Sequence, residues 1–225
     1  MIYITGDTHI PIDIEKLNEK NFPQQVNMNK GDYVIICGDF GGVWNNSEEE
    51  LQWREWLRQR NFTTLFIDGN HENFQLLNEY EVDLWNGGKV HFINDSIIYL
   101  MRGQVFTIEE LKFFTMGGGE STDKASRVEG LSWWSEEIPN SSEYAEALSN
   151  LDKNNWNVDY VITHTCSMNL MQKLGFVKEN NSLNDFFDIL QNNLQYNHWY
   201  FGHFHDDIKL DERHTLLFDN VIRIF

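Results

Sequence analysis

The sequence predicts an α/β fold in which two mixed sheets pack face to face and helices cover them, a four-layer α/β/β/α sandwich. Short apolar runs rich in β-branched residues recur along the chain, and several of the early ones are apolar throughout, as in strands buried on both faces. Segments with helical spacing of apolar residues separate some of these runs. Residues 90–116 and 198–225 instead indicate hairpins, which add antiparallel strands to the parallel ones.

The expected strands are short and lie at residues 2–5, 33–37, 64–67, 90–93, 97–101, 104–108, 113–116, 158–163, 198–201, 206–210 and 215–225. Turn-forming residues separate the strands of the expected hairpins, at Asn94 and Asp95, at Arg102 and Gly103, and across residues 211–213. Because strands joined by a tight turn pair antiparallel, these turns predict the antiparallel parts of both sheets.

Three helices are expected between the strands. The first begins with a capping box formed by Ser47 and Glu50, and its acidic residues 48–50 favour the positive end of the helix dipole. The second carries apolar residues at helical spacing, namely Tyr144, Leu148 and Leu151. The third begins at Ser182 and presents an apolar stripe of Leu183, Phe186, Phe187, Leu190 and Leu194.

The composition indicates one domain that spans residues 1–225. A hydrophobic content of 41% and an aromatic content of 14% are sufficient for a buried core and exclude intrinsic disorder. With only three prolines, no Ser/Gly-rich spacer and no internal repeat, nothing marks a linker. Two cysteines exclude a disulfide framework; Cys37 is expected to be buried, and Cys166 has no second cysteine nearby with which to form a thiolate metal site.

The charge balance limits the partners of the protein. Lysine and arginine total 17 against 35 aspartate and glutamate, a formal net charge of −18, which repels nucleic-acid backbones and anionic membranes. A small phosphorylated substrate held by metal ions is compatible with this charge, and no feature indicates a protein partner. Met1 leads directly into the first expected strand, without a signal peptide or an apolar stretch of about 18 residues, so we expect a soluble, cytoplasmic protein.

Acidic, amide and imidazole groups follow five of the expected strands. They read Gly-Asp-Thr-His at residues 6–9, Gly-Asp-Phe-Gly-Gly at 38–42, Asp-Gly-Asn-His-Glu at 68–72, His at 164 and Gly-His-Phe-His at 202–205. Because the carboxyl ends of neighbouring parallel strands open onto one crevice, these five fragments can converge on one point. Imidazoles and carboxylates together favour Mn, Fe or Zn over Ca or Mg, so the pattern predicts a transition-metal site.

Local geometry supports this convergence, although each fragment alone has a simpler interpretation. Alternation along an extended backbone would place Asp7 with His9, and His203 with His205, on one face. A glycine before four of the motif residues permits a tight turn. Taken singly, Asp-x-His is usually a surface turn, and Asn70 suits a helix N-cap. Five such strand ends in one chain are better explained by a site for two metal ions.

The ordered motifs Gly-Asp-x-His, Gly-Asp-x-x-Gly, Gly-Asn-His-Glu, a strand-end His and Gly-His-x-His resemble those of the calcineurin-like metallophosphoesterase superfamily. The resemblance implies the four-layer fold of that superfamily and two divalent transition-metal ions, with Mn²⁺ favoured and Fe or Zn as alternatives. It implies that one ion is bound by Asp7, His9, Asp39 and His205. It implies that the other ion is bound by Asp39, Asn70, His164 and His203, so that Asp39 bridges the two.

The resemblance also implies a hydrolytic mechanism. A hydroxide that bridges the two ions would attack the phosphorus, since paired cations lower the pKa of a shared water. His71 would not be a ligand but would face the substrate and donate to the phosphoryl oxygens or the leaving group. To act as an acid it needs a group that holds its proton, for which Asp68 and Glu72 are candidates. Residues 39–44 lack the Asp-Arg pair of the superfamily's Ser/Thr protein phosphatases, which disfavours that activity.

A glycine-rich segment after the expected strand 113–116 supplies two cations in an otherwise acidic chain. Lys124 and Arg127 are three residues apart, and either is a candidate for binding the substrate phosphate. The alternative is a surface loop in which Arg127 pairs with an acidic neighbour, namely Glu120, Asp123 or Glu129. Trp133 and Trp134 either flank an aromatic leaving group or belong to the core. The histidines outside the motifs are expected to have structural roles, namely His91, His198 and His214.

We therefore expect dimetal-dependent hydrolysis of phosphate esters, by a phosphodiesterase or a broad-specificity phosphoesterase acting on small-molecule or nucleotide substrates. One alternative is a phosphomonoesterase or protein phosphatase. Another, from a different class, is a non-catalytic metal-binding scaffold or interaction protein of the same fold. All eight motif positions carry residues suited to their implied roles, which disfavours the scaffold.

Overall fold

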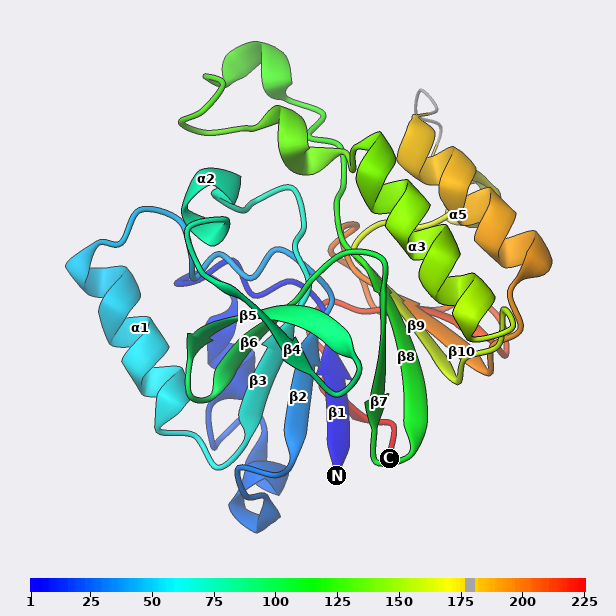
Figure 1. Ribbon diagram of the computed structural model, residues 1–225. Coiled ribbons are helices and arrows are strands. Elements are labelled where there is room, and N and C mark those ends of the chain that lie inside the picture. Colours follow the sequence, from blue (N-terminus) through cyan, green and yellow to red (C-terminus); the bar gives the residue numbers. More distant parts are fainter. Residues whose placement is uncertain (177–180) are drawn as a thin grey trace.

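Two sheets form the centre of the computed structural model, which describes residues 1–176 and 181–225 (Figure 1). The first sheet has seven strands in the order β13-β1-β2-β3-β6-β5-β4. Its strands are β1 (Ile2–Thr5), β2 (Tyr33–Ile36), β3 (Thr63–Phe66), β4 (Val82–Trp85), β5 (Gly88–Asn94), β6 (Ile97–Leu100) and β13 (Ile222–Arg223). The neighbours β1, β2, β3 and β6 run parallel, while β13, β5 and β4 make antiparallel pairs.

The second sheet has six strands in the order β11-β12-β10-β9-β8-β7. Its strands are β7 (Gln104–Ile108), β8 (Leu111–Met116), β9 (Tyr160–Thr163), β10 (His198–Phe201), β11 (Ile208–Lys209) and β12 (His214–Leu216). The four central strands are parallel, and an antiparallel strand closes each end. Both sheets are therefore mixed, as the sequence predicts.

Helices cover the outer face of each sheet (Figure 1). On the side of the first sheet lie α1 (Glu48–Arg58) and α2 (Phe74–Leu77), and on the side of the second lie α3 (Ser141–Lys153), α4 (Met168–Lys173) and α5 (Ser182–Asn193). Short 3₁₀ helices are η1 (Ile14–Leu17), η2 (Pro23–Asn27), η3 (Lys124–Ser126) and η4 (Ser135–Glu137). Among the described residues, no helix combines the length and the apolar character needed to cross a bilayer.

Three apolar clusters hold these layers together. The cluster between the sheets contains residues of both, among them Ile35 and Leu65 of the first and Ile162 of the second. A second cluster packs Leu57 of α1 against the outer face of the first sheet, and a third packs Phe187 of α5 against the second sheet. Because burial of apolar area is the main favourable term in folding, these clusters stabilise the predicted four-layer α/β/β/α arrangement.

The three predicted helices are present, but the details of two helix starts differ from the prediction. Ser47 accepts a hydrogen bond from the Glu50 backbone N–H, as in a capping box, whereas the Glu50 carboxylate forms a buried ion pair with Arg54 instead of completing the box. The third helix is capped by Asn181, one residue before the predicted Ser182. Asn181 caps this helix because its side-chain oxygen accepts from the backbone N–H groups of both Leu183 and Asn184.

Some predicted strand connections are wrong. Arg102 and Gly103 lead from β6 in the first sheet to β7 in the second, so this turn is a crossover and not a hairpin. The reason is that Arg102 is buried in an ion pair with Asp68 and does not lie in a surface turn. Residues 215–225 contribute to two strands in different sheets, β12 and β13. The edge strand β4 was not predicted, since its mostly exposed residues show no buried face.

The loops that follow β1, β2, β3, β9 and β10 carry all five motif segments. These loops meet where the two sheets adjoin. The backbone carbonyl of Cys37, directly after β2, accepts a hydrogen bond of 2.8 Å from Nδ1 of His164, directly after β9. The predicted convergence of the strand ends therefore occurs, and it joins the first sheet to the second.

Candidate metal centre

Four of the predicted ligands form one compact group at the end of β1. Asp7, His9, Asp39 and His205 each place one ligand atom within 4.8 Å of all the others. Nε2 of His9 lies 3.1 Å from Asp39, and Nε2 of His205 lies 3.3 Å from Asp7. Both carboxylates are buried, whereas the His205 side chain is half exposed. This is the set that the resemblance assigns to one metal ion.

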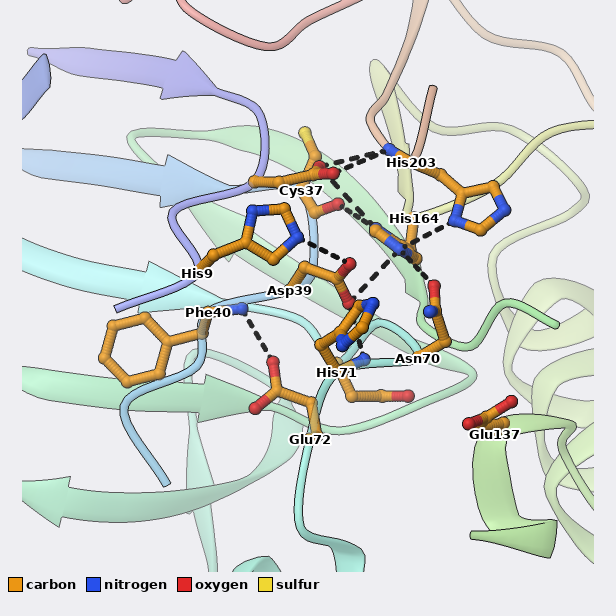
Figure 2. A network of polar contacts seen from close by, with 12 residues as sticks. His9, Cys37, Asp39, Phe40, Asn70, His71, Glu72, Glu137, His164 and His203 are labelled. Carbon is orange, nitrogen blue, oxygen red and sulfur yellow. Dashed lines mark hydrogen bonds and ion pairs between the residues drawn. The ribbon is translucent and has the colours of Figure 1, made fainter. Parts of the chain in front are cut away.

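The other predicted ligands surround Nε2 of His164, which is fully buried (Figure 2). This nitrogen lies 3.3 Å from Oδ1 of Asp39, 3.1 Å from Oδ1 of Asn70 and 3.2 Å from Nδ1 of His203. All four groups that the resemblance assigns to the second ion therefore meet at one point.

Asp39 lies between the two groups. Its Oδ2 faces His9 in the first group and its Oδ1 faces His164 in the second. Oδ1 also accepts a 2.7 Å hydrogen bond from the backbone N–H of His71. A carboxylate with one oxygen toward each group has the arrangement that a bridging ligand needs.

Close approach of the loops depends on motif glycines. A Cβ atom at Gly69 would collide with the carboxylate of Asp39, and one at Gly202 would collide with that of Asp7.

The predicted placement of Asp7 with His9, and of His203 with His205, by alternation along extended backbone is wrong, because His9 and His203 have positive φ values of 34° and 73°. Turns of the backbone, and not strand-like alternation, direct these imidazoles into the site.

Contacts behind the ligands were not predicted from the sequence. Asp13 lies 2.7 Å from Nδ1 of His9, so Nε2 is left to face Asp39. The Cys37 carbonyl holds Nδ1 of His164 in the same way. Such partners of the second ring nitrogen typically orient metal-binding histidines. Neither contact leaves a signal in the sequence, since residues 9–13 are not helical and a backbone carbonyl belongs to every residue.

Asn70 has a partner from a distant segment, which was also missed. Its Nδ2 donates to Oγ of Ser121 at 3.1 Å, and this hydroxyl donates to Oε1 of Glu137 at 2.8 Å. Burial raises the pKa of Glu137, and the hydrogen bonds from Ser121 oppose that rise. No sequence motif marks either residue.

Buried charges couple the two groups electrostatically. Burial opposes a charge on His164, but the carboxylates of Asp39 and Asp7 raise its pKa to about 10. Burial likewise opposes ionisation of Asp39, yet the neighbouring imidazoles of His164 and His9 hold its pKa well below the usual range. The carboxylates of Asp39 and Asp7 also raise the pKa of His9 against the effect of burial. The buried carboxylates of Asp7 and Asp39 are therefore the negative charges around which these imidazoles gather.

His71 lies at the edge of this centre against Arg127. Each terminal nitrogen of the guanidinium is 3.4 Å from one ring nitrogen of His71. Burial lowers the pKa of His71, and the charge on Arg127 lowers it further, which outweighs the opposite effect of Asp39. The protonated form of the ring is thus disfavoured, and no sequence pattern marks Arg127 as its neighbour.

Neither predicted partner of His71 is its partner in the described residues. Asp68 pairs with Arg102 at 2.5 Å and accepts from the Tyr99 hydroxyl at 2.7 Å, so it is fully engaged beneath the loop. Glu72 is fully buried and accepts from the backbone N–H of Phe40 at 2.7 Å. Both carboxylates support the loops after β3 and β2 and do not orient the imidazole.

The two predicted substrate cations have different surroundings. Nε of Arg127 donates to Asp123 at 2.8 Å, which is one of the ion pairs considered for a purely structural loop. Lys124 pairs with Glu120 at 3.1 Å and lies over the ring of Trp133. Trp134 is buried and packs edge-on against Trp44, as expected for a core residue.

The family model for calcineurin-like phosphoesterases matches residues 1–207 of the chain. The chain belongs to the calcineurin-like phosphoesterase family. No curated protein matches it significantly. Members of this family are metal-dependent phosphoesterases that use divalent ions. The two groups of side chains at the junction of the two sheets are therefore candidates for holding such ions.

The residues of this calcineurin-like phosphoesterase fit such ions. The first group consists of carboxylate and imidazole atoms within coordination reach of one another, and the second adds a neutral amide oxygen from Asn70. Transition metals prefer this mixture of nitrogen and oxygen ligands. The assignment of individual ligands to each ion remains a prediction.

The protonation of His164 leads to a test on the metal-free protein. Because its pKa of about 10 exceeds the ordinary 6.5, its charge stabilises the fold fully below about pH 6.5, and this contribution is lost as the pH rises through about 10. Metal binding requires neutral imidazole and so releases the proton between these values. At about pH 8 we expect wild type to release about one proton more per chain than His164→Asn on binding Mn²⁺. Calorimetry in two buffers of different ionisation enthalpy measures the number of protons released. Equal release by wild type and His164→Asn would contradict the assignment of His164 as a protonated residue that loses its proton on metal binding.

Proposed function

We propose that the protein hydrolyses phosphate esters of small molecules or nucleotides with two divalent ions, Mn²⁺ foremost, as a phosphodiesterase or a broad-specificity phosphoesterase. The observation that carries the proposal is Asp39, whose two carboxylate oxygens face the two ligand groups. When bound, a pair of ions supplies Lewis-acid stabilisation of the phosphoryl oxygens and lowers the pKa of a water molecule.

The chain's own groups have separate tasks in this proposal. Asp39 holds the two groups in register, while Asp13 and the Cys37 carbonyl keep the imidazoles of His9 and His164 oriented. His71, in its protonated form, delivers a proton to the leaving-group oxygen; because burial and Arg127 lower its pKa, this step weakens as the pH rises. Arg127, beside His71, binds a phosphoryl oxygen through its guanidinium.

A cavity beside the centre supports a substrate of small size. It has a volume of about 360 Å³ and is lined by Ser121, Lys124, Thr165, Met171 and Asn184, among others. It adjoins the centre, because Ser121 contacts Asn70 and Thr165 follows His164. Small-molecule pockets start at about 300 Å³, so this space suits the organic group of a modest ester. A nucleic-acid chain is disfavoured by the net charge of −18.

The proposal is tested with two model substrates. We expect Mn²⁺-dependent cleavage of bis-p-nitrophenyl phosphate, and comparison with p-nitrophenyl phosphate separates phosphodiesterase from phosphomonoesterase activity. Absence of cleavage of either ester by protein that carries two ions per chain would instead favour the non-catalytic scaffold.

Replacement of Arg127 tests its role in substrate binding. If the guanidinium binds the phosphoryl group, Arg127→Ala removes roughly 1.5–3 kcal/mol of transition-state stabilisation, because hydrogen bonds to a charged group are lost. The value of kcat/KM falls by the corresponding factor. The thermal midpoint should fall only slightly, because the lost contacts are an ion pair with the exposed Asp123 and one hydrogen bond to the Ser132 carbonyl. The matched variant Asp123→Asn breaks the ion pair but keeps the arginine. Wild-type kinetics of Arg127→Ala, or an equal loss in Asp123→Asn, would assign the pair a structural role.

A further inference from the structure

A hydrogen-bonded chain of three buried side chains runs away from the second ligand group. Nδ2 of Asn70, in the loop after β3, donates to Oγ of Ser121, in the loop after β8. Ser121 donates in turn to Oε1 of Glu137, in η4, and its backbone N–H donates to Oε2 of the same carboxylate at 2.9 Å. Exposed fractions are 4%, 4% and 0% along the chain. In Figure 2, Asn70 lies between His164 and Glu137.

The chain has a defined polarity. Both oxygens of Glu137 accept from Ser121, so the Ser121 hydroxyl hydrogen is used toward the carboxylate and its oxygen lone pairs face Asn70. An amide that meets an acceptor must present its NH₂ group. Oδ1 of Asn70 is thereby turned the other way, toward Nε2 of His164 at 3.1 Å.

We propose that Ser121 and Glu137 are positioning residues that fix the Asn70 amide with its oxygen, and not its nitrogen, toward the second metal position. This inference rests on the proposed function, in which Asn70 is a ligand. An amide nitrogen carries no free lone pair for a cation, so a rotated Asn70 would place two hydrogens where the ligand oxygen belongs.

The loop after β8, which carries Ser121, is also joined to η4 by a backbone hydrogen bond. This bond separates the effect of the Glu137 side chain on Asn70 from simple support of the loop. The backbone N–H of Gly119 donates to the Glu137 carbonyl at 3.0 Å, a contact that needs neither side chain. The Glu137 carboxylate is therefore not required to join the two segments. Its specific effect is the direction of the hydrogen bond that reaches Asn70.

Glu137→Gln reverses that direction at nearly constant shape. The Ser121 backbone N–H can only donate, so it claims the new amide oxygen and leaves the new NH₂ group facing Oγ of Ser121. The hydroxyl then accepts from residue 137, and its hydrogen is free to donate toward Asn70, which favours the rotated amide. Ser121→Ala instead removes the link and leaves the Asn70 amide without direction.

The test is calorimetric titration of the metal-depleted full chain with Mn²⁺ alone. We expect wild type to bind two ions, Glu137→Gln to bind one of them roughly 10- to 100-fold more weakly, and Ser121→Ala to show a smaller loss of at least about threefold. The double variant should match Ser121→Ala, because without the hydroxyl the polarity of residue 137 no longer reaches Asn70. The control Glu136→Gln changes the exposed neighbouring carboxylate and should bind Mn²⁺ as wild type does.

Each result decides the matter. Wild-type Mn²⁺ affinity in Glu137→Gln, or the same loss from Glu137→Gln with and without the Ser121 hydroxyl, overturns the positioning role. If Glu137→Gln does not fold, as circular dichroism of the metal-free protein reports, unchanged affinity in Ser121→Ala overturns it alone. A wild-type protein that binds fewer than two ions overturns the proposed function and this inference with it.

Discussion

Asp39→Ala is expected to lose both metal ions and to lower kcat/KM by more than about 10²-fold. Removal of a contact behind a metal ligand already costs about 10- to 100-fold in affinity or activity, and Asp39 serves both ligand groups directly. Its two oxygens lie 3.1 Å from His9 and 3.3 Å from His164. Without this buried charge, the second group has no carboxylate and the first retains only that of Asp7.

Two further variants make the result specific. Asp39→Asn keeps an oxygen that accepts from the His71 backbone N–H, so its fold is preserved while the bridging charge is lost. Asp13→Ala removes a carboxylate that touches only His9 among the ligands and should weaken one ion alone. Metal content by mass spectrometry, with kcat/KM on the same preparations, provides the measurement. Two ions at full occupancy in Asp39→Ala would refute the bridging assignment.

The convergence of the strand ends could be predicted because it follows from topology. Parallel strands leave their carboxyl ends on one edge, and five short motifs placed directly after apolar runs mark that edge in the sequence. The glycines were informative for the same reason, since Gly69 and Gly202 sit where a loop passes against a carboxylate. The four layers and the convergence of the motif side chains could thus be predicted from the sequence.

The remaining features depend on contacts that no local pattern encodes. Asn70 and Ser121 are 51 residues apart, and His71 and Arg127 are 56 apart. Nothing in the sequence indicates that a distant side chain will approach either residue. The crossover at Arg102 was mistaken for a hairpin for the same reason. Its ion-pair partner, Asp68, lies in the loop after β3, far from Arg102 in the sequence. Short-range patterns predict elements, whereas these pairings arise from packing.

His71→Ala is expected to keep both metal ions and to lower kcat by about 10²- to 10⁴-fold, the usual contribution of general acid catalysis. The His71 imidazole contacts Arg127 and packs edge-on against the ring of His9, whereas Asp39 accepts from the backbone N–H of His71, which the variant keeps. Removal of the ring therefore takes away no hydrogen bond to a ligand atom. Because its pKa is lowered by burial and by Arg127, the protonated form becomes scarce as the pH rises. Wild-type kcat should therefore fall with rising pH in a way that His71→Ala does not.

The leaving group provides the sharper criterion. An ester with an activated leaving group such as p-nitrophenol needs little protonation, so His71→Ala should lose much less activity toward it than toward an alkyl ester. The control is His198→Asn, at the opposite end of β10, where the ring contacts the Thr215 hydroxyl and no ligand. It should retain both ions and wild-type kcat for both esters. A lost ion in His71→Ala would make His71 a ligand, and equal losses for both esters would exclude its role as the acid.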